Sequence, residues 1–321
     1  MAQQTNTPAR AQLDEILDLI AEELQITATQ HADAESKYVA VGAWLGKADS
    51  PLASFDPSIY AQGSLRIGTT VKPIHKQEFD LDLVCELQQL RGVNFTPSQV
   101  YELIWLRMKS NATYREIVKA LPRCIRLNYA NNFHLDIVPA IPDGVLSTGA
   151  TRIPDRDLKV WLPSNPKGYA RWFEAKTVVR LRKVALDARI EPLHVQEAAA
   201  DKAPLKLAVQ LLKRWRDIAF EKRAETAPSS IVVTTIAALV YGGEPDVSSS
   251  LSGMLPRISD WAARGECRLT NPANPSEVIT DRWLQEPGAL DAFREEVANF
   301  AATWQTPVSY THLRAHETVL D

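Results

Sequence analysis

The sequence predicts an α+β protein in which a mixed sheet with helices is followed by a helical C-terminal lobe. Apolar residues at helical spacing between residues 11 and 46 predict a long N-terminal helix. Alternating or continuous apolar runs predict strands at Phe79–Leu87, Cys124–Tyr129 and Phe133–Val138. After Pro142 the composition changes, and a Pro-rich stretch is followed by long segments of helical character. With 321 residues, 45% of them hydrophobic, the chain can bury a full core.

The elements of the N-terminal half have local signals in the sequence. Two prolines between Ala48 and Pro57 end the N-terminal helix, because proline has no backbone N–H to continue it. Thr96 is a typical N-cap and Pro97 a typical first-turn residue, so a helix is predicted at Pro97–Lys109. Asn131 and Asn132 are turn residues, and we expect them to join the two strands that flank them.

The C-terminal half shows mostly helical signals. The segment Tyr169–Phe220 is predicted to be helical, with breaks near Pro192 and Pro204. Basic residues outnumber acidic ones between Lys167 and Arg223, which suits either a solvated helix face or a surface that meets phosphate groups. The remaining segments are interpreted as a Pro-rich connection at Ile153–Pro166, a buried helix or strand at Ile231–Tyr241, a Ser-rich loop at Val247–Ser252 and an amphipathic helix at Leu290–Trp304.

Three regions are expected along the chain. Residues 1–165 hold the N-terminal helix and the sheet-containing core, and residues 166–306 form the helical lobe. Residues 307–321 resemble a translated cloning adaptor and are expected to be a non-native tail. His312 and His316 lie in this tail without an HExxH pattern, so they predict no metal site.

Composition excludes several classes of protein. Thirty-six basic and 39 acidic residues leave a net charge of −3, which argues against nucleic-acid binding along the whole chain. No segment has the order of a secretory signal or the length of a membrane span, so we expect a cytoplasmic protein without membrane contact. Cys85, Cys124 and Cys267 are widely spaced and form no CxxC pair, which favours reduced thiols over disulfides or zinc.

The first predicted strand carries two aspartates that are spaced to share one face of the sheet. Asp80 and Asp82 are two residues apart, so on a strand they project from one face while Phe79, Leu81 and Leu83 point into the core. Two neighbouring carboxylates repel each other and are usually held by cations, and Mg²⁺ prefers carboxylate and phosphate oxygens. A sheet face exposed to water is the alternative interpretation of the same pattern.

A third carboxylate and a glycine-serine pair extend this pattern. Asp136 is the one acidic residue in an apolar run, where a lone charge is costly unless it is paired or binds metal. If its strand lies beside Phe79–Leu87, three carboxylates meet in the arrangement used for two-metal phosphoryl transfer. Upstream, Gly63 allows close approach of an anion and Ser64 supplies a donor, before a helix predicted near Leu65–Gly68.

Three segments resemble the nucleotidyltransferase superfamily with a DNA polymerase β-like core. They are Ala61-Gln-Gly-Ser-Leu-Arg-Ile-Gly-Thr, Glu78-Phe-Asp-Leu-Asp-Leu-Val and Leu135-Asp-Ile-Val-Pro. Within that superfamily, residues 10 to 305 resemble the cyclic GMP-AMP synthase and oligoadenylate synthetase branch, and in it the bacterial CD-NTases. The resemblance implies Asp80, Asp82 and Asp136 as metal ligands and catalytic residues, with Asp136 helping to deprotonate the attacking ribose hydroxyl.

The resemblance also implies a set of nucleotide-binding residues. Gln62, Gly63 and Ser64 match the segment that contacts phosphate. Leu211-Leu-Lys-Arg-Trp-Arg is similar to the family's helix whose lysine reaches the triphosphate, which implies Lys213, with Lys206 as the second choice. The remaining implied contacts are Ser229 or Ser230 beside the nucleotide, and Asn274 and Asp281 near the base.

The function implied is a metal-dependent nucleotidyltransferase that makes a cyclic di- or trinucleotide second messenger from ATP, GTP or both in antiphage (CBASS) signalling. Two Mg²⁺ ions are implied, for which Mn²⁺ can substitute. The chain has no zinc insertion of the kind used to sense double-stranded DNA, so direct DNA sensing is not expected, and a regulatory protein partner or phage-derived activator is left open. Two alternatives stay open: an enzyme that makes linear products or extends RNA or protein, and a dormant nucleotide-binding module.

Overall fold

A computed structural model describes residues 7–74, 79–91, 94–129, 133–143, 149–177, 190–193, 195–264 and 268–305. The predicted turn at Asn131–Asn132, Cys267 and the tail at 307–321 lie outside these residues. Among the helices described, none combines the length and apolar character that a membrane span requires.

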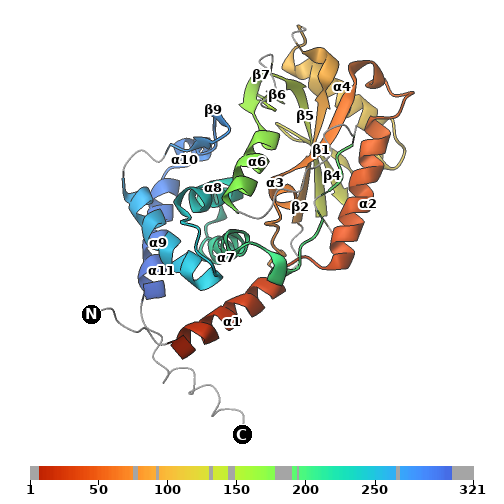
Figure 1. The fold of residues 1–321 in the computed structure, drawn as a ribbon. Coiled ribbons are helices and arrows are strands. Elements are labelled where there is room, and N and C mark those ends of the chain that lie inside the picture. Colours follow the sequence, from red (N-terminus) through yellow and green to blue (C-terminus); the bar gives the residue numbers. More distant parts are fainter. Residues whose placement is uncertain are drawn as a thin grey trace.

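The described strands form one mixed sheet of seven strands and a separate hairpin (Figure 1). Along the sheet the order is β1 (Pro57–Gln62), β2 (Phe79–Leu87), β5 (Phe133–Pro142), β4 (Ile125–Tyr129) and β3 (Val118–Ala120), with β6 (Thr151–Asp155) paired to β5 and β7 (Val160–Ser164) paired to β6. The β2–β5 pair is parallel, and the other pairs of the sheet are antiparallel. The interpretation of Ile153–Pro166 as a connection was wrong, because this segment contains the second part of β6 and all of β7.

The alternation in β2 divides the sheet into a core face and a polar face. Phe79, Leu81 and Leu83 are buried, as predicted, in a cluster with side chains of α2 (Ala28–Leu45) and α4 (Pro97–Lys109). Helix α4 begins as predicted. The Thr96 hydroxyl accepts a hydrogen bond from the backbone N–H of Gln99, and Oε1 of Gln99 accepts one from the backbone N–H of Thr96. The opposite face of β2 is left for Asp80 and Asp82.

The prediction of one long N-terminal helix was wrong. The chain forms α1 (Thr7–Glu23) and α2, because Thr27 and Gln30 make a capping box that starts a new helix. The apolar spacing runs across both helices, which hid the break. Leu17 and Ala21 of α1 pack into the core of the C-terminal lobe, so α1 lies against that lobe, while α2 covers the sheet (Figure 1).

The C-terminal lobe is helical, as predicted, and contains a small hairpin. Its larger helices are α6 (Pro166–Lys176), α7 (Pro204–Ala219), α8 (Ser230–Val240), α9 (Val247–Ala263) and α11 (Ala289–Gln305), with α10 (Asp281–Gln285) and the hairpin β8 (Thr270–Asn271) and β9 (Asn274–Val278) between α9 and α11. The shorter elements of the chain are α3 (Gly63–Arg66), α5 (Tyr114–Ile117) and single 3₁₀ turns at Ala53–Phe55, Gln88–Leu90, Ala199–Asp201 and Ala224–Thr226.

The Ser-rich segment predicted as a loop, Val247–Ser252, is the first part of α9. Asp246 caps this helix by accepting a hydrogen bond of 2.7 Å from the backbone N–H of Ser249. The hydroxyls of Ser250 and Ser252 donate to carbonyls one turn back, at 2.7 Å each. The loop prediction was wrong, because these serine hydroxyls are satisfied within the helix itself.

Candidate active site

The parallel pairing of β2 and β5 brings three carboxylates onto one wall. Asp82 lies directly opposite Asp136, and Asp80 lies two residues before Asp82 on the same face. Asp80 is exposed, Asp82 is half-buried and Asp136 is buried. The prediction that the strand of Asp136 neighbours the strand of the two aspartates is therefore confirmed. We call Asp80, Asp82 and Asp136 the acid wall.

Arg126 on β4 contacts the acid wall, and it was not predicted from the sequence. Its Nε and Nη2 donate to the two carboxylate oxygens of Asp136 at 2.7 Å each, and Nη2 lies 3.4 Å from Oδ1 of Asp80. The antiparallel register places Arg126 directly opposite Asp136. A single arginine in the apolar run Cys124–Tyr129 was the available signal.

The negative charge of the acid wall exceeds the positive charge of Arg126, because one guanidinium faces three carboxyl groups. The pKa of Asp82 is raised to about 7, first by burial and then by the charges of Asp136 and Asp80, against Arg126 and Lys213, which lower it. In the described residues, no three His, Cys, Asp or Glu side chains already converge on a point that could hold a metal ion, and Arg126 contacts the oxygens a cation would use. The carboxylate oxygens and the excess of negative charge suit a hard divalent cation, which would compete with Arg126 for these oxygens.

The turn after β1 brings the Gly-Ser pair against this wall. Gly63 has φ +69°, and a Cβ at this position would overlap Oδ2 of Asp82. Only glycine allows the backbone to pass so close to the carboxylate. The Ser64 hydroxyl accepts a hydrogen bond of 3.2 Å from Oγ1 of Thr70, and its carbonyl accepts one of 2.9 Å from the Thr69 N–H.

Lys213 of α7 lies behind the same turn. Its Nζ donates to the carbonyl and the hydroxyl of Thr69 at 3.0 Å each. The pKa of Lys213 is lowered to about 7, mainly by burial and next by the charge of the neighbouring Arg216. Lys206, two turns earlier, instead forms an ion pair with Glu197 at 2.7 Å.

A cavity of about 620 Å³ opens between the sheet and the helical lobe, within the usual size of small-molecule sites, about 300–1,000 Å³. Of the residues predicted for the site, those that line it are Gln62, Gly63, Ser64, Asp80, Asp82, Asp136, Lys213 and Ser230. Those that do not line it are Lys206, Ser229, Asn274 and Asp281.

The predicted residues outside the cavity wall have contacts within the fold. Ser229 is the N-cap residue of α8. Asn274 donates to the carbonyl of Ser164 at 3.3 Å, and Asp281 lies 3.6 Å from Nη2 of Arg123. These contacts hold the hairpin and α10 against the core.

Glu277 lies in the cavity wall and was not singled out from the sequence. It stands on β9, where its Oε2 accepts hydrogen bonds from Nδ2 of Asn271 at 2.7 Å and from the backbone N–H of Asn165 at 3.0 Å. Burial raises the pKa of this carboxyl above its usual range. It lies between Asn274 and Asp281, the two residues predicted near the base, but its place on the cavity depends on the hairpin.

Comparisons with known proteins find relatives of this chain in sequence and in fold. Residues 12–176 match the Second Messenger Oligonucleotide or Dinucleotide Synthetase domain. Over 302 residues the chain is 34% identical to a c-di-GMP synthase of Roseivirga ehrenbergii, covering 92% of this chain and 80% of that protein. It is 29% identical over 306 residues to the cyclic dinucleotide synthase CdnG of Bradyrhizobium diazoefficiens, covering 84% of this chain and 70% of that one. The structure of the B. diazoefficiens CD-NTase CdnG in complex with GTP superposes with a TM-score of 0.74 at 25% identity, covering 92% of each chain.

Proposed function

The chain belongs to the bacterial CD-NTase family of nucleotidyltransferases, and we propose that it joins two purine nucleoside triphosphates into a cyclic dinucleotide. The observation that carries the proposal is the pairing of Asp82 with Asp136 on adjacent parallel strands. Both aspartates line a cavity that Ser64 and Lys213 also line. The relatives named as c-di-GMP and cyclic dinucleotide synthases support the product class.

Each of the two steps is the same reaction. A ribose hydroxyl oxygen attacks the α-phosphorus of a second nucleotide, a new P–O bond forms, and the bond to the β-phosphate breaks with loss of pyrophosphate. Asp136 accepts the hydroxyl proton in this proposal, directly or through water. Ser64 and Lys213 hold the triphosphate, so that catalysis is mainly positioning and charge neutralisation.

Magnesium fits the acid wall as the cofactor. Asp80 and Asp82 would hold both ions, and Asp136 would contribute to one, since carboxylate oxygens are the ligands that Mg²⁺ prefers. When bound, two such ions supply charge neutralisation of the triphosphate and activation of the hydroxyl. Arg126 then has to release the carboxylate oxygens that it contacts in this structure.

We propose guanine as the base, because Glu277 lies in the cavity wall. A carboxylate such as that of Glu277 accepts hydrogen bonds from N1–H and the 2-amino group of guanine, and adenine presents neither donor there. The complex of CdnG with GTP is consistent with this choice. We therefore propose GTP for at least one of the two positions. A role in antiphage signalling and control by a protein partner or phage-derived activator stay predictions from the resemblance.

The test is incubation with the four α-labelled nucleoside triphosphates and Mg²⁺, followed by phosphatase and separation of products. A phosphatase-resistant product that requires GTP, and is absent from the Asp80→Asn, Asp82→Asn double variant, supports the proposal. Phosphatase-sensitive products indicate linear synthesis instead. Binding of nucleotide without any product, with or without Mn²⁺, indicates a dormant module.

A further inference from the structure

The chain from Gly68 to Lys72, which follows the Gly-Ser turn, is held from behind by side chains at and before α7. Four of its backbone carbonyls each accept a hydrogen bond or bonds from one such side chain. The pairs are Gly68 with Lys202 (3.0 Å), Thr69 with Lys213 (3.0 Å), Thr70 with Gln210 (2.5 Å) and Lys72 with Arg214. We call Lys202, Gln210, Lys213 and Arg214 the carbonyl clamp.

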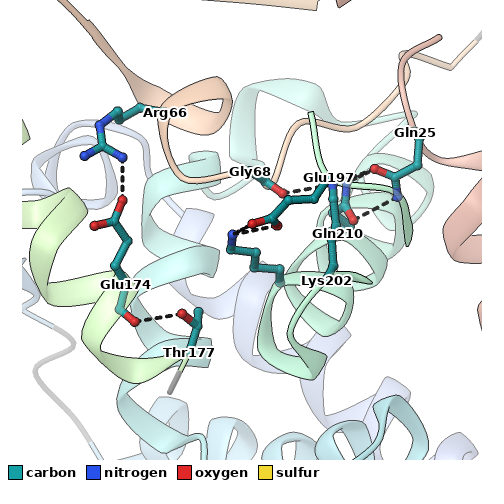
Figure 2. Close-up of polar contacts among 9 residues, drawn as sticks. Gln25, Arg66, Gly68, Glu174, Thr177, Glu197, Lys202 and Gln210 are labelled. Atoms are coloured by element: carbon teal, nitrogen blue, oxygen red, sulfur yellow. Dashed lines mark hydrogen bonds and ion pairs between the residues drawn. The ribbon is translucent and has the colours of Figure 1, made fainter. Parts of the chain in front are cut away.

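Gln25, in the link between α1 and α2, contacts Lys202 and Gln210 of the carbonyl clamp (Figure 2). Its amide and that of Gln210 form a reciprocal pair, with N–O distances of 3.0 and 3.1 Å. Oε1 of Gln25 also accepts from Nζ of Lys202 at 2.6 Å, and its Nε2 donates to the carbonyl of Ala21 at 2.5 Å. The N-terminal helices are thereby joined to two members of the carbonyl clamp.

The pair with Gln25 sets the orientation of the Gln210 amide. Gln210 is fully buried, and its Nε2 donates both to Gln25 and to the carbonyl of Thr70. An amide turned by half a rotation would place its oxygen against that carbonyl, where neither group can donate. Gln25 opposes this rotation, because it offers an acceptor to Nε2 and a donor to Oε1 of Gln210.

The clamped residues in turn hold Ser64. The hydroxyl of Thr70 donates to Oγ of Ser64 at 3.2 Å, and the N–H of Thr69 donates to its carbonyl at 2.9 Å. Thr70 and Ser64 line the cavity, whereas Gln25 and Gln210 do not. A route of direct contacts therefore runs from the α1–α2 link to the nucleotide site.

We propose that Gln25 is a positioning residue for the nucleotide, acting through Gln210 and the clamped chain on Ser64. The inference rests on the proposed function only in taking Ser64 as a triphosphate contact. Loss of the Gln25 amide weakens binding of the triphosphate without removing any group that takes part in the chemical step. The link between α1 and α2 then contributes to nucleotide binding.

The experiment compares Gln25→Met with Gln25→Glu in the full chain. Methionine keeps the length but neither accepts nor donates well. Glutamate keeps the acceptor for Lys202 and for Nε2 of Gln210, but it cannot donate, so its second oxygen faces Oε1 of Gln210 and the carbonyl of Ala21. With Mg²⁺ and either ATP or GTP, we expect Gln25→Met to raise Kd and KM about tenfold, with kcat within about twofold of wild type. Gln25→Glu, which lacks the donor to Gln210, should also raise Kd and KM by at least about threefold.

Thr27→Ala is the matched control, because it breaks the capping box of α2 two residues away and touches no member of the carbonyl clamp. It should lower the unfolding midpoint and leave Kd and KM unchanged. The inference is overturned if Gln25→Met leaves Kd unchanged, if Thr27→Ala raises Kd as much, or if Gln25→Glu leaves Kd unchanged.

Two further arrangements keep the result decisive. If Gln25→Met does not fold, Gln210→Glu replaces it, since glutamate still accepts from Nε2 of Gln25 but can donate neither to Thr70 nor to Gln25; an unchanged Kd then overturns the inference. Calorimetric Kd values do not require turnover. A wild-type chain that binds nucleotide but makes no product refutes the proposed function, and the ratio of Kd values still decides the role of Gln25.

Discussion

Lys213→Met replaces a buried ammonium by an apolar side chain of similar length. Lys213 is 5% exposed, and burial lowers its pKa to about 7 from the usual 10.5 of a lysine. The folded state therefore favours the neutral form, and between pH 7 and 10.5 the unfolded chain binds more protons than the folded one. The stability that this lysine costs the wild type is largest below pH 7 and fades as the pH rises.

The magnitude follows from the two pKa values. Each unit of difference corresponds to about 1.4 kcal/mol, so the full cost is at most about 5 kcal/mol below pH 7, and about 2 kcal/mol of it disappears between pH 7 and pH 9. The variant also loses two hydrogen bonds to Thr69, worth about 1 kcal/mol each, but this loss does not depend on pH. Removal of Lys213 raises the pKa of Asp82 as well, which changes the comparison in the same direction.

The assay is denaturant unfolding of wild type and Lys213→Met without Mg²⁺ or nucleotide, between pH 6 and pH 9. The stability of the variant relative to wild type should fall by about 2 kcal/mol from pH 7 to pH 9, while product formation is lost at every pH. Repeating the pair in an Asp82→Asn background isolates the lysine. Lys222→Met, at an exposed position just after α7, is the control and should show a far smaller pH dependence.

A difference in unfolding free energy that stays constant from pH 6 to pH 9 would refute the reasoning. It would mean that Lys213 keeps an ordinary pKa, so that the buried environment described for it is wrong. A variant that keeps wild-type KM and kcat would refute its role as a triphosphate contact.

Three further predictions concern the acid wall and the base. Asp80→Asn with Asp82→Asn should remove product below detection yet leave the unfolding midpoint equal or higher, because carboxylate repulsion disappears; a lower midpoint would contradict this. Arg126→Gln should lower the unfolding free energy by about 2 kcal/mol without Mg²⁺, since Asp136 loses a bidentate partner, and added Mg²⁺ should stabilise the variant more than wild type in thermal melts; equal stability without Mg²⁺ would count against it. Glu277→Gln should raise KM for GTP about tenfold and leave KM for ATP within about twofold, and an equal change for both nucleotides would exclude guanine reading.

Elements with strong local signals were predicted closely. Strand β2 and helix α4 have the predicted bounds, because alternation in the one and a threonine cap with a first-turn proline in the other act within a few residues. The breaks that were missed also had local signals. Thr27 with Gln30, and Asp246 before the serines of α9, are caps whose pattern was outweighed by apolar spacing and serine content.

Only part of the candidate site follows from local structure. Asp80 and Asp82 share a face because of strand geometry alone, but Asp136 joins them only through the parallel pairing of β2 and β5. Lys206 and Lys213 lie on one helix, and nothing in their spacing tells which of them reaches the cavity. The contact of Lys206 with Glu197, and of Lys213 with Thr69, decides it.

The sequence by itself determined the class of fold, the paired aspartates and the Gly-Ser turn, because these depend on backbone periodicity and on the chemistry of neighbouring residues. Only the tertiary structure decided that Arg126 faces Asp136, that Glu277 lines the cavity and that Gln25 pairs with Gln210 across 185 positions. Such contacts depend on strand order and on the packing of α1 against α7. Both are set by the burial of the whole core, which no short stretch of sequence records.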